Sequence, residues 1–323
     1  MTRPMIDRSR FLSAVTATAT AVVLAPRGAS AQNVPTPIRV GGSPNDDMTA
    51  VVYAARTGMY QRAGLDVTIE KTNSGAAAAA AVASGAFDIG KSSISSIFDA
   101  HVKGIPFTVI APAAIYDSKS PYGGFLLAGT STLRTGKDAE GQIVAVASLG
   151  SIGRVAFAGW VERNGGDSRT VKFVEVPIPA VPAALDAKRI VAGETSQPVQ
   201  ESAIAAGYRL LPAYDVIAPQ FAVAVFYTTK DFSAKHPDAL RSFVRVTYEA
   251  ARAVNGHSEM TTKLMSEYTG VALEILQKTP RVTLGTELLL AQVQSPIDAA
   301  VKYGTLAKGF LAREIVDANV TAR

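Results

Sequence analysis

The sequence predicts an α/β protein built as two lobes, with two crossings of the chain between them. Short apolar strands alternate with turns containing Gly and Ser and with helical repeats, which is typical of a parallel or mostly parallel sheet covered by helices. The 323 residues are enough for two domains with separate cores. Between Tyr116 and Gly124 the composition shifts to Ser, Lys, Pro and Gly, as expected of an exposed interdomain crossing.

Residues 1–31 have the features of an export signal and are set apart from the fold. Arginines at positions 3, 8 and 10 precede an apolar stretch from 11 to 24, which is shorter than the roughly 20 residues that span a bilayer. Ala29-Ser30-Ala31 forms an A-x-A cleavage site, so we expect the mature chain to begin at Gln32. Ser9 stands where a twin-arginine signal has its second arginine, which favours the general secretory route.

The first lobe is expected to consist of strand–helix units. Ile38 and Val40 begin a strand, a turn follows at 41–46, and apolar residues repeat at helical spacing from 48 until Gly58 ends the helix. A second strand is expected at 65–69, with a helix opening at 73–75. A third strand at 87–90 leads into a helix start at 91–94, and a buried strand follows at 107–111.

The second lobe is expected to repeat this plan before the chain returns. Strands are expected at 125–127, 143–146 and 171–176, and helices open at 148–151 and 183–187. The aromatic and β-branched run from Phe221 to Tyr227 is expected to be the returning strand. A long amphipathic helix follows His236-Pro237, and the remainder is mainly helical. We place the first lobe at 32–122 and 228–323 and the second at 123–227.

Composition and motifs exclude several function classes. The chain has no cysteine, which removes disulfides, thiol catalysis, a Cys-based metal site and lipid attachment at cysteine, and favours a free periplasmic protein. Residues 1–31 carry +3 of the formal charge of +5, so the remaining +2 gives no basis for binding nucleic acid. His101, His236 and His257 form no recognisable catalytic or metal-binding motif. We therefore predict no catalytic residue, metal or cofactor, and no later membrane span.

Four turns at the carboxyl ends of predicted strands are candidate ligand contacts, because a ligand settles beyond the strand ends in open α/β sheets. Helix starts there offer unpaired N–H groups, glycine admits a close backbone approach, and serine adds a donor without bulk. Any single serine at such a place can also be only a helix cap. The candidates in these turns are Ser43, Asn45, Ser74, Gly75, Ser92, Ser93, Ser148, Gly150 and Ser151.

Acidic and aromatic residues near the same turns supply further candidates. Asp46 and Glu194 could match a cationic group of a ligand, and Asp47 could equally do so, although one of the two neighbouring aspartates is expected to cap the following helix. Gln197 lies close to Glu194 in the sequence and Tyr116 stands at the expected crossing. An aromatic residue at a crossing can serve as a wall of the site or simply as packing.

Several short motifs carry a resemblance to a known family. They are Tyr53-Ala54-Ala55 with Gly58-Met59-Tyr60, Gly64-Leu65-Asp66-Val67, Ser84-Gly85-Ala86-Phe87-Asp88-Ile89-Gly90, Lys137-Asp138 with Gly141, and Gln294-Ser295-Pro296-Ile297-Asp298 with Tyr303-Gly304. With them, nearly the whole mature chain resembles the periplasmic substrate-binding proteins of the nitrate, sulfonate and taurine type, which include the thiamine-pyrimidine-precursor group. The glutamate-proline element of that family is altered here to Glu194-Thr195-Ser196-Gln197-Pro198.

The resemblance implies a two-lobed type II periplasmic-binding-protein fold that closes on a small ligand. It also implies an ABC importer whose membrane permease receives that ligand, and a monomeric receptor. We expect the ligand to be an anion of the sulfonate or nitrate kind, or else an amine or a heterocycle that the acidic residues of the same turns would suit. Two alternatives stay open: an enzyme on the same scaffold, and a ligand receptor for a membrane sensor. The related pyrimidine synthases carry a cysteine-rich motif, so the absence of cysteine disfavours that activity.

Overall fold

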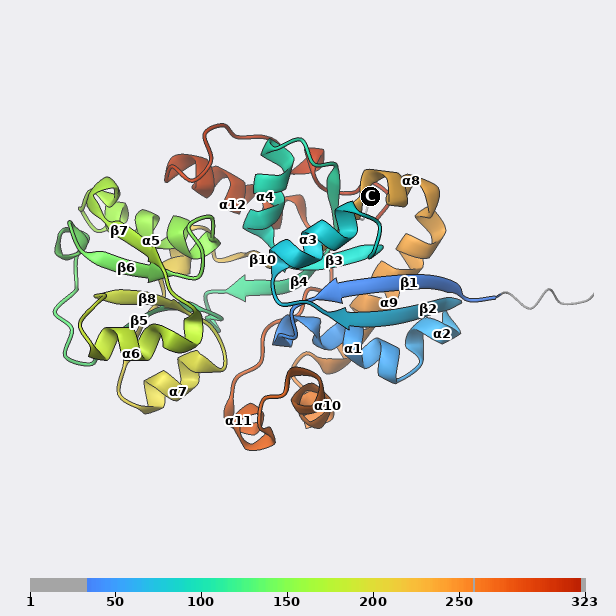
Figure 1. Cartoon of the computed structure of the whole chain (residues 1–323), viewed down its shortest axis with the longest axis horizontal. Coiled ribbons are helices and arrows are strands. Elements are labelled where there is room, and N and C mark those ends of the chain that lie inside the picture. Colours follow the sequence, from blue (N-terminus) through green and yellow to red (C-terminus); the bar gives the residue numbers. More distant parts are fainter. Residues whose placement is uncertain (1–33, 258, 321–323) are drawn as a thin grey trace, which may run out of the picture. The chain divides into compact units, whose positions relative to one another are not determined.

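The structure, a computed structural model, describes residues 34–257 and 259–320. The expected export signal and the expected mature start at Gln32 lie outside the described residues. The described chain forms two five-stranded sheets, each with helices packed on it, which confirms the predicted two-lobed α/β fold (Figure 1). Within this part of the chain, no helix combines the length and the apolar character of a membrane span.

The first sheet contains four strands from the start of the described chain and one that returns later. Its spatial order is β2 (Leu65–Lys71), β1 (Thr36–Gly42), β3 (Ile89–Ser93), β10 (Gln220–Thr229) and β4 (Phe107–Asp117). β1 is parallel to both β2 and β3, whereas β10 is antiparallel to β3 and β4. β4 is buried along nearly its whole length because it lies under helices and beneath the C-terminal segment.

Helices on both faces of the first sheet bury its apolar side chains. They are α1 (Thr49–Arg56), α2 (Met59–Arg62), α3 (Gly75–Ala83), α4 (Ile94–Val102), α8 (Lys230–Lys235) and α9 (Pro237–Val254). The expected long amphipathic helix is α9, which begins with Pro237 at its first position. It packs through Phe243, whose ring stacks on Tyr60 at a centroid distance of 5.2 Å, while the Tyr60 hydroxyl pairs with Thr247 at 2.7 Å.

The second sheet repeats the plan of the first. Its spatial order is β7 (Lys172–Glu175), β6 (Ile143–Val146), β8 (Ala192–Thr195), β5 (Gly124–Leu127) and β9 (Arg209–Leu211). β6 is parallel to β7 and β8, and β5 is antiparallel to β8 and β9. In each sheet, the antiparallel strand is the one that directly follows a crossing. The helices are α5 (Ile152–Arg163), α6 (Val181–Asp186) and α7 (Val199–Ala205).

Both crossings between the lobes lie at other residues than the sequence indicated. β4 extends to Asp117, so Tyr116, which we expected in an exposed crossing, is a fully buried strand residue. The first passage between the sheets therefore covers 118–123. β10 lies in the first sheet along its whole length, so the return precedes Gln220 rather than Thr228. We accordingly propose 118–219 for the second lobe.

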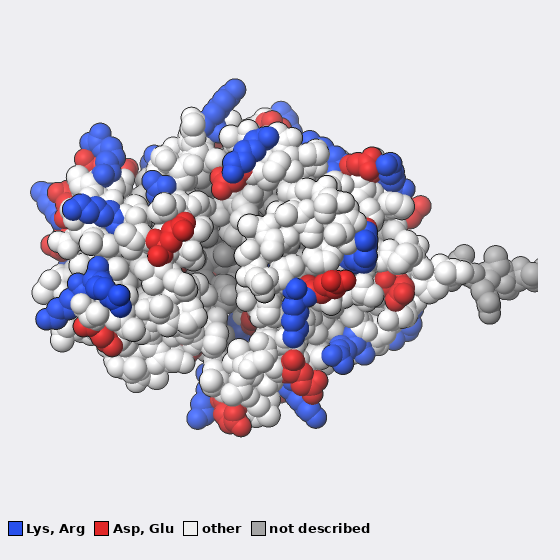
Figure 2. All heavy atoms as spheres, in the orientation of Figure 1, with Lys and Arg blue, Asp and Glu red and all other residues white. Residues whose placement is uncertain are grey.

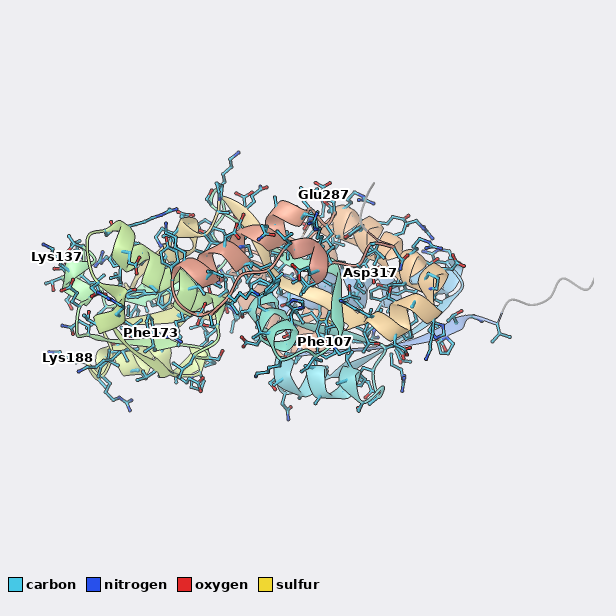
Figure 3. The ribbon with its side chains drawn as sticks, turned by 90° about the horizontal axis from the view of Figure 1, so that it is seen from above. Phe107, Lys137, Phe173, Lys188, Glu287 and Asp317 are labelled. Atoms are coloured by element: carbon cyan, nitrogen blue, oxygen red, sulfur yellow. The ribbon has the colours of Figure 1, made fainter. Side chains whose placement is uncertain are left out.

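The C-terminal part after α9 is mainly helical, as expected, and it contacts both lobes. It contains α10 (Glu259–Thr269), α11 (Leu273–Lys278) and α12 (Leu290–Lys302), with single bridges from Thr283 and Val316 to β4. α12 lies over the junction of the two lobes (Figure 3). A Cβ atom at Gly159 of α5 would lie 2.6 Å from the Tyr303 ring, so this end of α12 packs directly on the second lobe. One buried apolar cluster consequently includes residues of both lobes.

Candidate ligand-binding site

A cavity of about 350 Å³ lies between the lobes, and residues of both sheets line it. The face shown in Figure 2 is hollowed where the two lobes meet, and most charged side chains of that face lie away from the hollow. The first lobe supplies the turn after β1, the start of α3, the end of β3 and the start of α4. The second lobe supplies the turn after β6, the end of β8 and the first residues of α5.

The first-lobe wall contains a buried ion pair. Lys91 Nζ lies 2.8 Å from Asp47 Oδ1 and 3.0 Å from Oδ2. Burial raises the pKa of the Asp47 carboxyl, and the ammonium of Lys91 opposes that rise. The two side chains thus bring charge into the cavity wall while adding no net charge to it.

Two helix starts and an unpaired hydroxyl lie beside that ion pair. Gly75 opens α3, and Ser95 belongs to the first turn of α4. Ser93, the N-cap residue of α4, makes no side-chain cap, because its hydroxyl pairs with that of Ser95 at 2.9 Å. Ser92 is 3% exposed, and its Oγ has no hydrogen-bond partner among the described residues. This wall therefore offers unused hydrogen-bonding groups to a ligand.

The second-lobe wall is organised around the carboxylate of Glu194. Its Oε2 accepts hydrogen bonds from Ala147 N at 2.7 Å and Ser151 Oγ at 2.9 Å, and its Oε1 accepts one from the Tyr214 hydroxyl at 2.9 Å. A Cβ atom at Gly153 would lie 2.2 Å from the carboxyl carbon, so only glycine leaves room for Glu194 at the start of α5. Burial raises the pKa of Glu194, and the three donors partly offset that rise.

Thr195, the residue after Glu194, adds a second unpaired hydroxyl. Thr195 is 1% exposed, and its Oγ1 has no partner among residues 34–257 and 259–320. Tyr122 and Tyr214 also line the cavity. Each lobe thus contributes one buried hydroxyl to the lining of the cavity. A ligand could supply the hydrogen-bond partner that each of these hydroxyls lacks.

The structure brings together eight of the residues singled out in the sequence, and Asp47, named there as an alternative to Asp46, lies with them. Around the cavity lie Ser43, Asn45, Gly75, Ser92, Ser93, Ser148, Ser151 and Glu194. All of them except Glu194 come from the turns expected at the strand carboxyl ends, and Glu194 lies in β8. Their place around one cavity is the arrangement that the sequence predicts for a ligand site, and their contact with a ligand stays a prediction.

Two further candidates have structural partners outside the cavity. Tyr116, for which the sequence left open a role as a wall of the site or as packing, is packed in the interior, where its hydroxyl donates to Asp215 Oδ1 at 2.6 Å. Ser74 caps α3 by accepting a hydrogen bond from Ala77 N at 3.2 Å. Both side chains therefore serve the fold, since β4 is longer than the sequence pattern indicated and α3 needs its cap.

Asp46, Gln197 and Gly150 line neighbouring hollows instead. Arg281 binds the carboxylate of Asp46 through Nε at 2.7 Å and through Nη2, which ties the C-terminal segment to the turn after β1. Gln197 donates to Glu201 at 3.1 Å and lies beside the same hollow as Asp46. Gly150 faces α4, where an added Cβ would meet Asp99 Oδ2 at 3.0 Å.

The sequence reasoning missed Lys91 and Thr195 as site residues, and it assigned no definite role to Asp47. Lys91 was expected at a helix start, but it lies inside β3. A lysine between buried strand positions requires a buried partner, which is the signal that could have identified the pair. Its partner Asp47 lies in a turn 44 residues earlier, and only the parallel pairing of β1 with β3 shows that the two meet.

Comparison with solved structures finds this fold in proteins of low sequence identity. The periplasmic aliphatic sulphonate binding protein SsuA from Escherichia coli has a TM-score of 0.73 at 15% identity, over 90% of this chain and 94% of that chain. The periplasmic nitrate-binding protein NrtA from Synechocystis PCC 6803 has a TM-score of 0.67 at 13% identity, over 84% and 82%. The desulfurization enzyme DSZB has a TM-score of 0.62 at 12% identity, over 88% and 97%. These likenesses establish the fold.

The sequence itself is similar to one family. No curated protein matches it significantly. The family model described as NMT1/THI5 like matches residues 45–260, which is more than half of the chain and includes the cavity residues from Asn45 to Ala224. This chain therefore belongs to the NMT1/THI5-like family, as the resemblance of its short motifs indicated.

Proposed function

We propose that this chain is an extracytoplasmic solute-binding receptor, which captures a small ligand between its lobes and passes it to the permease of an ABC importer. Family membership, the binding proteins named among the similar structures, and the predicted export signal support this function. The signal also supports a periplasmic location with a mature start at Gln32, and we propose a monomeric receptor. The two ligand alternatives, an anion and a heterocycle, are both compatible with a cavity of this size.

The observation that carries the proposal is the pair of unpaired hydroxyls on facing lobes. Ser92 and Thr195 are both nearly inaccessible to water, yet neither hydroxyl has a partner among the described residues. A buried hydroxyl without a hydrogen bond costs about 1–3 kcal/mol. A ligand held between the lobes would supply the missing partners of both hydroxyls at once, which a site confined to one lobe could not do.

An enzyme on the same scaffold is the alternative class, and DSZB shows that the fold admits one. The lining residues described here include neither histidine nor cysteine. Ser151 lies close to Glu194, but its hydroxyl both donates to Glu194 and accepts from Arg154 N at 3.3 Å as the cap of α5. Ser151 is thereby held as a structural group, so we favour binding over catalysis.

Native mass spectrometry of the exported protein, purified without denaturation, tests the receptor function. We expect a small molecule to remain bound at one copy per chain and to be recovered chemically unchanged after prolonged incubation. N-terminal sequencing of the same material should begin at Gln32. Recovery of a converted product would support the enzyme alternative, and retention of residues 1–31 in a membrane fraction would contradict the periplasmic assignment.

Reconstitution distinguishes an importer from a sensor. A permease and ATPase encoded beside this chain, placed in liposomes, should hydrolyse ATP faster when the ligand-loaded protein is added than when the empty protein is added. Unchanged hydrolysis, together with stimulation of a neighbouring membrane kinase, would assign the chain to a sensor instead.

A further inference from the structure

A second, smaller hollow lies between the lobes next to the ligand cavity, and two of its lining residues carry polar atoms without partners. Its volume is about 100 Å³. Gln197 and Pro198 line it from the second lobe, and Arg281 is among the residues that line it from the first. We propose that Arg281 donates a hydrogen bond to Gln197 when the lobes close, so that these two residues hold the closed form together from outside the ligand cavity.

Arg281 has one nitrogen left for such a contact. Its Nε donates to Asp46 Oδ1 at 2.7 Å, and its Nη2 donates to Asp46 and, at 3.2 Å, to Thr49 Oγ1. Nη1 is buried and has no hydrogen-bond partner in the described part of the chain. Because the side chain is only 12% exposed, water has little access to it. An unpaired N–H of a buried guanidinium favours any conformation that brings an acceptor to it.

Gln197 offers the matching acceptor. Its Nε2 donates to Glu201 Oε1 at 3.1 Å. Since an ionised carboxylate can only accept, the amide turns its nitrogen to Glu201 and leaves its oxygen for another partner. Gln197 Oε1 is buried, and it too lacks a partner among the residues described. Pro198, the other second-lobe residue of the lining, has no hydrogen-bonding side chain, so Gln197 supplies the side-chain acceptor of this lobe.

The hollow lies where closure changes the distance between the lobes. Gln197 lies just before α7, and Arg281 lies just after α11. These two helices lie on one side of the junction between the lobes, and α12 lies on the other (Figure 1). Tyr303, at the end of α12, packs against Gly159 of the second lobe. A closing rotation that keeps this packing would therefore bring Gln197 toward Arg281.

The contact gives a role to the altered element Glu194-Thr195-Ser196-Gln197-Pro198, which the receptor function accounts for only in part. Glu194 and Thr195 line the ligand cavity, whereas Gln197 lines the smaller hollow. Because the contact involves no ligand atom, it should raise the affinity for every ligand of the closed form by the same factor. The proposal rests on the closure of the proposed receptor and is independent of which ligand it takes.

Energy transfer between dyes on the two lobes tests the contact in the empty protein. The chain contains no cysteine, so Gln61→Cys on α2 and Lys137→Cys at the far end of the second lobe (Figure 3) give unique, exposed labelling positions. Single-molecule measurements give the ratio of closed to open molecules. Gln197→Leu should lower this ratio about tenfold, the effect of one hydrogen bond to a charged group. Gln142→Leu alters an exposed glutamine of the second lobe and should leave the ratio unchanged.

A second variant has an expected effect of opposite sign. Gln197→Glu combined with Glu201→Gln exchanges the two side chains, which keeps the net charge and the hydrogen bond between them and places a carboxylate beside Arg281. It should raise the ratio about tenfold over Glu201→Gln alone, because a hydrogen bond between two charged groups is stronger. Asp46 lines the same hollow, so a carboxylate that failed to reach Arg281 would be repelled and would lower the ratio. Thermal unfolding verifies that each variant is folded.

The outcomes separate this contact from the receptor function. An exchange variant that leaves the ratio unchanged or lowers it would overturn the proposal, and so would a Gln197→Leu variant that closes as often as the wild type. These measurements involve no ligand, so such a failure leaves the receptor function standing. If the ratios shift as expected and native mass spectrometry finds no retained small molecule, the receptor function is contradicted and the contact between the lobes stands.

Discussion

The ammonium nitrogen of Lys91 lies 2.8 Å from Asp47 Oδ1, and the two side chains are only 5% and 8% exposed. Taking both charges out of water is costly, and the contact offsets that cost only while both partners are present. The pair joins the turn after β1 to the end of β3 at the wall of the cavity. Its integrity therefore matters for the fold as well as for the shape of the site.

We expect Lys91→Met to lower the free energy of unfolding by about 3–5 kcal/mol, because it leaves Asp47 buried without a counter-charge. The double variant Asp47→Leu with Lys91→Met should lose less than the sum of the two single variants. Urea unfolding measures both. Lys235→Met removes the exposed pair with Asp231 and serves as the control, with an expected change below about 1 kcal/mol. Additive losses in the double variant would show that the contact is not energetically coupled.

Ser92→Ala and Thr195→Val should each weaken binding of the ligand identified by native mass spectrometry by roughly 2- to 10-fold, the effect of one neutral hydrogen bond. Neither change should lower the stability of the empty protein, because each removes a hydroxyl that has no partner there. Calorimetry and urea unfolding give the two readouts. Ser84→Ala, which removes a hydroxyl bonded to Ala81 O away from the cavity, should leave the affinity unchanged. A loss of stability without a loss of affinity would assign these hydroxyls to the fold.

The pH dependence of stability should contain a contribution from Glu194 with a defined sign. Burial raises the pKa of Glu194 in the folded chain above its ordinary value of 4.5. The folded state therefore holds the proton more tightly, and this contribution to the free energy of unfolding falls as pH rises above about 4.5, then levels off above the folded-state pKa. The stability difference between wild type and Glu194→Gln should decrease over that window. A difference that is constant or rises with pH would contradict a raised pKa.

Ligand binding should close the lobes by rotation about the two passages at 118–123 and just before β10, with each sheet preserved. Each lobe has its own hydrogen-bonded sheet, whereas few residues connect the sheets. Small-angle scattering with and without ligand should show a smaller radius of gyration in the loaded protein. An equal radius at saturating ligand, with an open empty form established independently, would exclude closure.

Local sequence patterns were sufficient for most elements, because alternation and helical repeats report directly on which face is buried. They identified β1, β2, β6 and α9, as well as the returning strand β10. They also identified the turns that surround the cavity, since Ser and Gly at strand ends are a local signal.

The features that the sequence did not predict depend on contacts between residues that lie far apart in the chain. Tyr116 was misplaced because its polar neighbours suggested a loop, whereas pairing with β10 keeps the chain in β4 as far as Asp117. Asp47 could be recognised as the partner of Lys91 only once the register between β1 and β3 was known. Glu194 was singled out and lies at the cavity, but its place at the start of α5 depends on the packing of β8 beside Gly153.

The ring of Tyr303 fills the space above Gly159 of α5. The end of α12 therefore packs on the second lobe, although α12 follows the first-lobe elements β10 and α9 in the sequence. We expect this contact to stay in place while the lobes close. During the predicted closure, a sliding motion of the lobes would have to withdraw the ring from Gly159, whereas a rotation would not. In such a rotation, atoms near Tyr303 would move little, and atoms at the far rim of the cavity would move most. We therefore expect a larger side chain at Gly159 to displace the Tyr303 ring and to change how the two lobes meet.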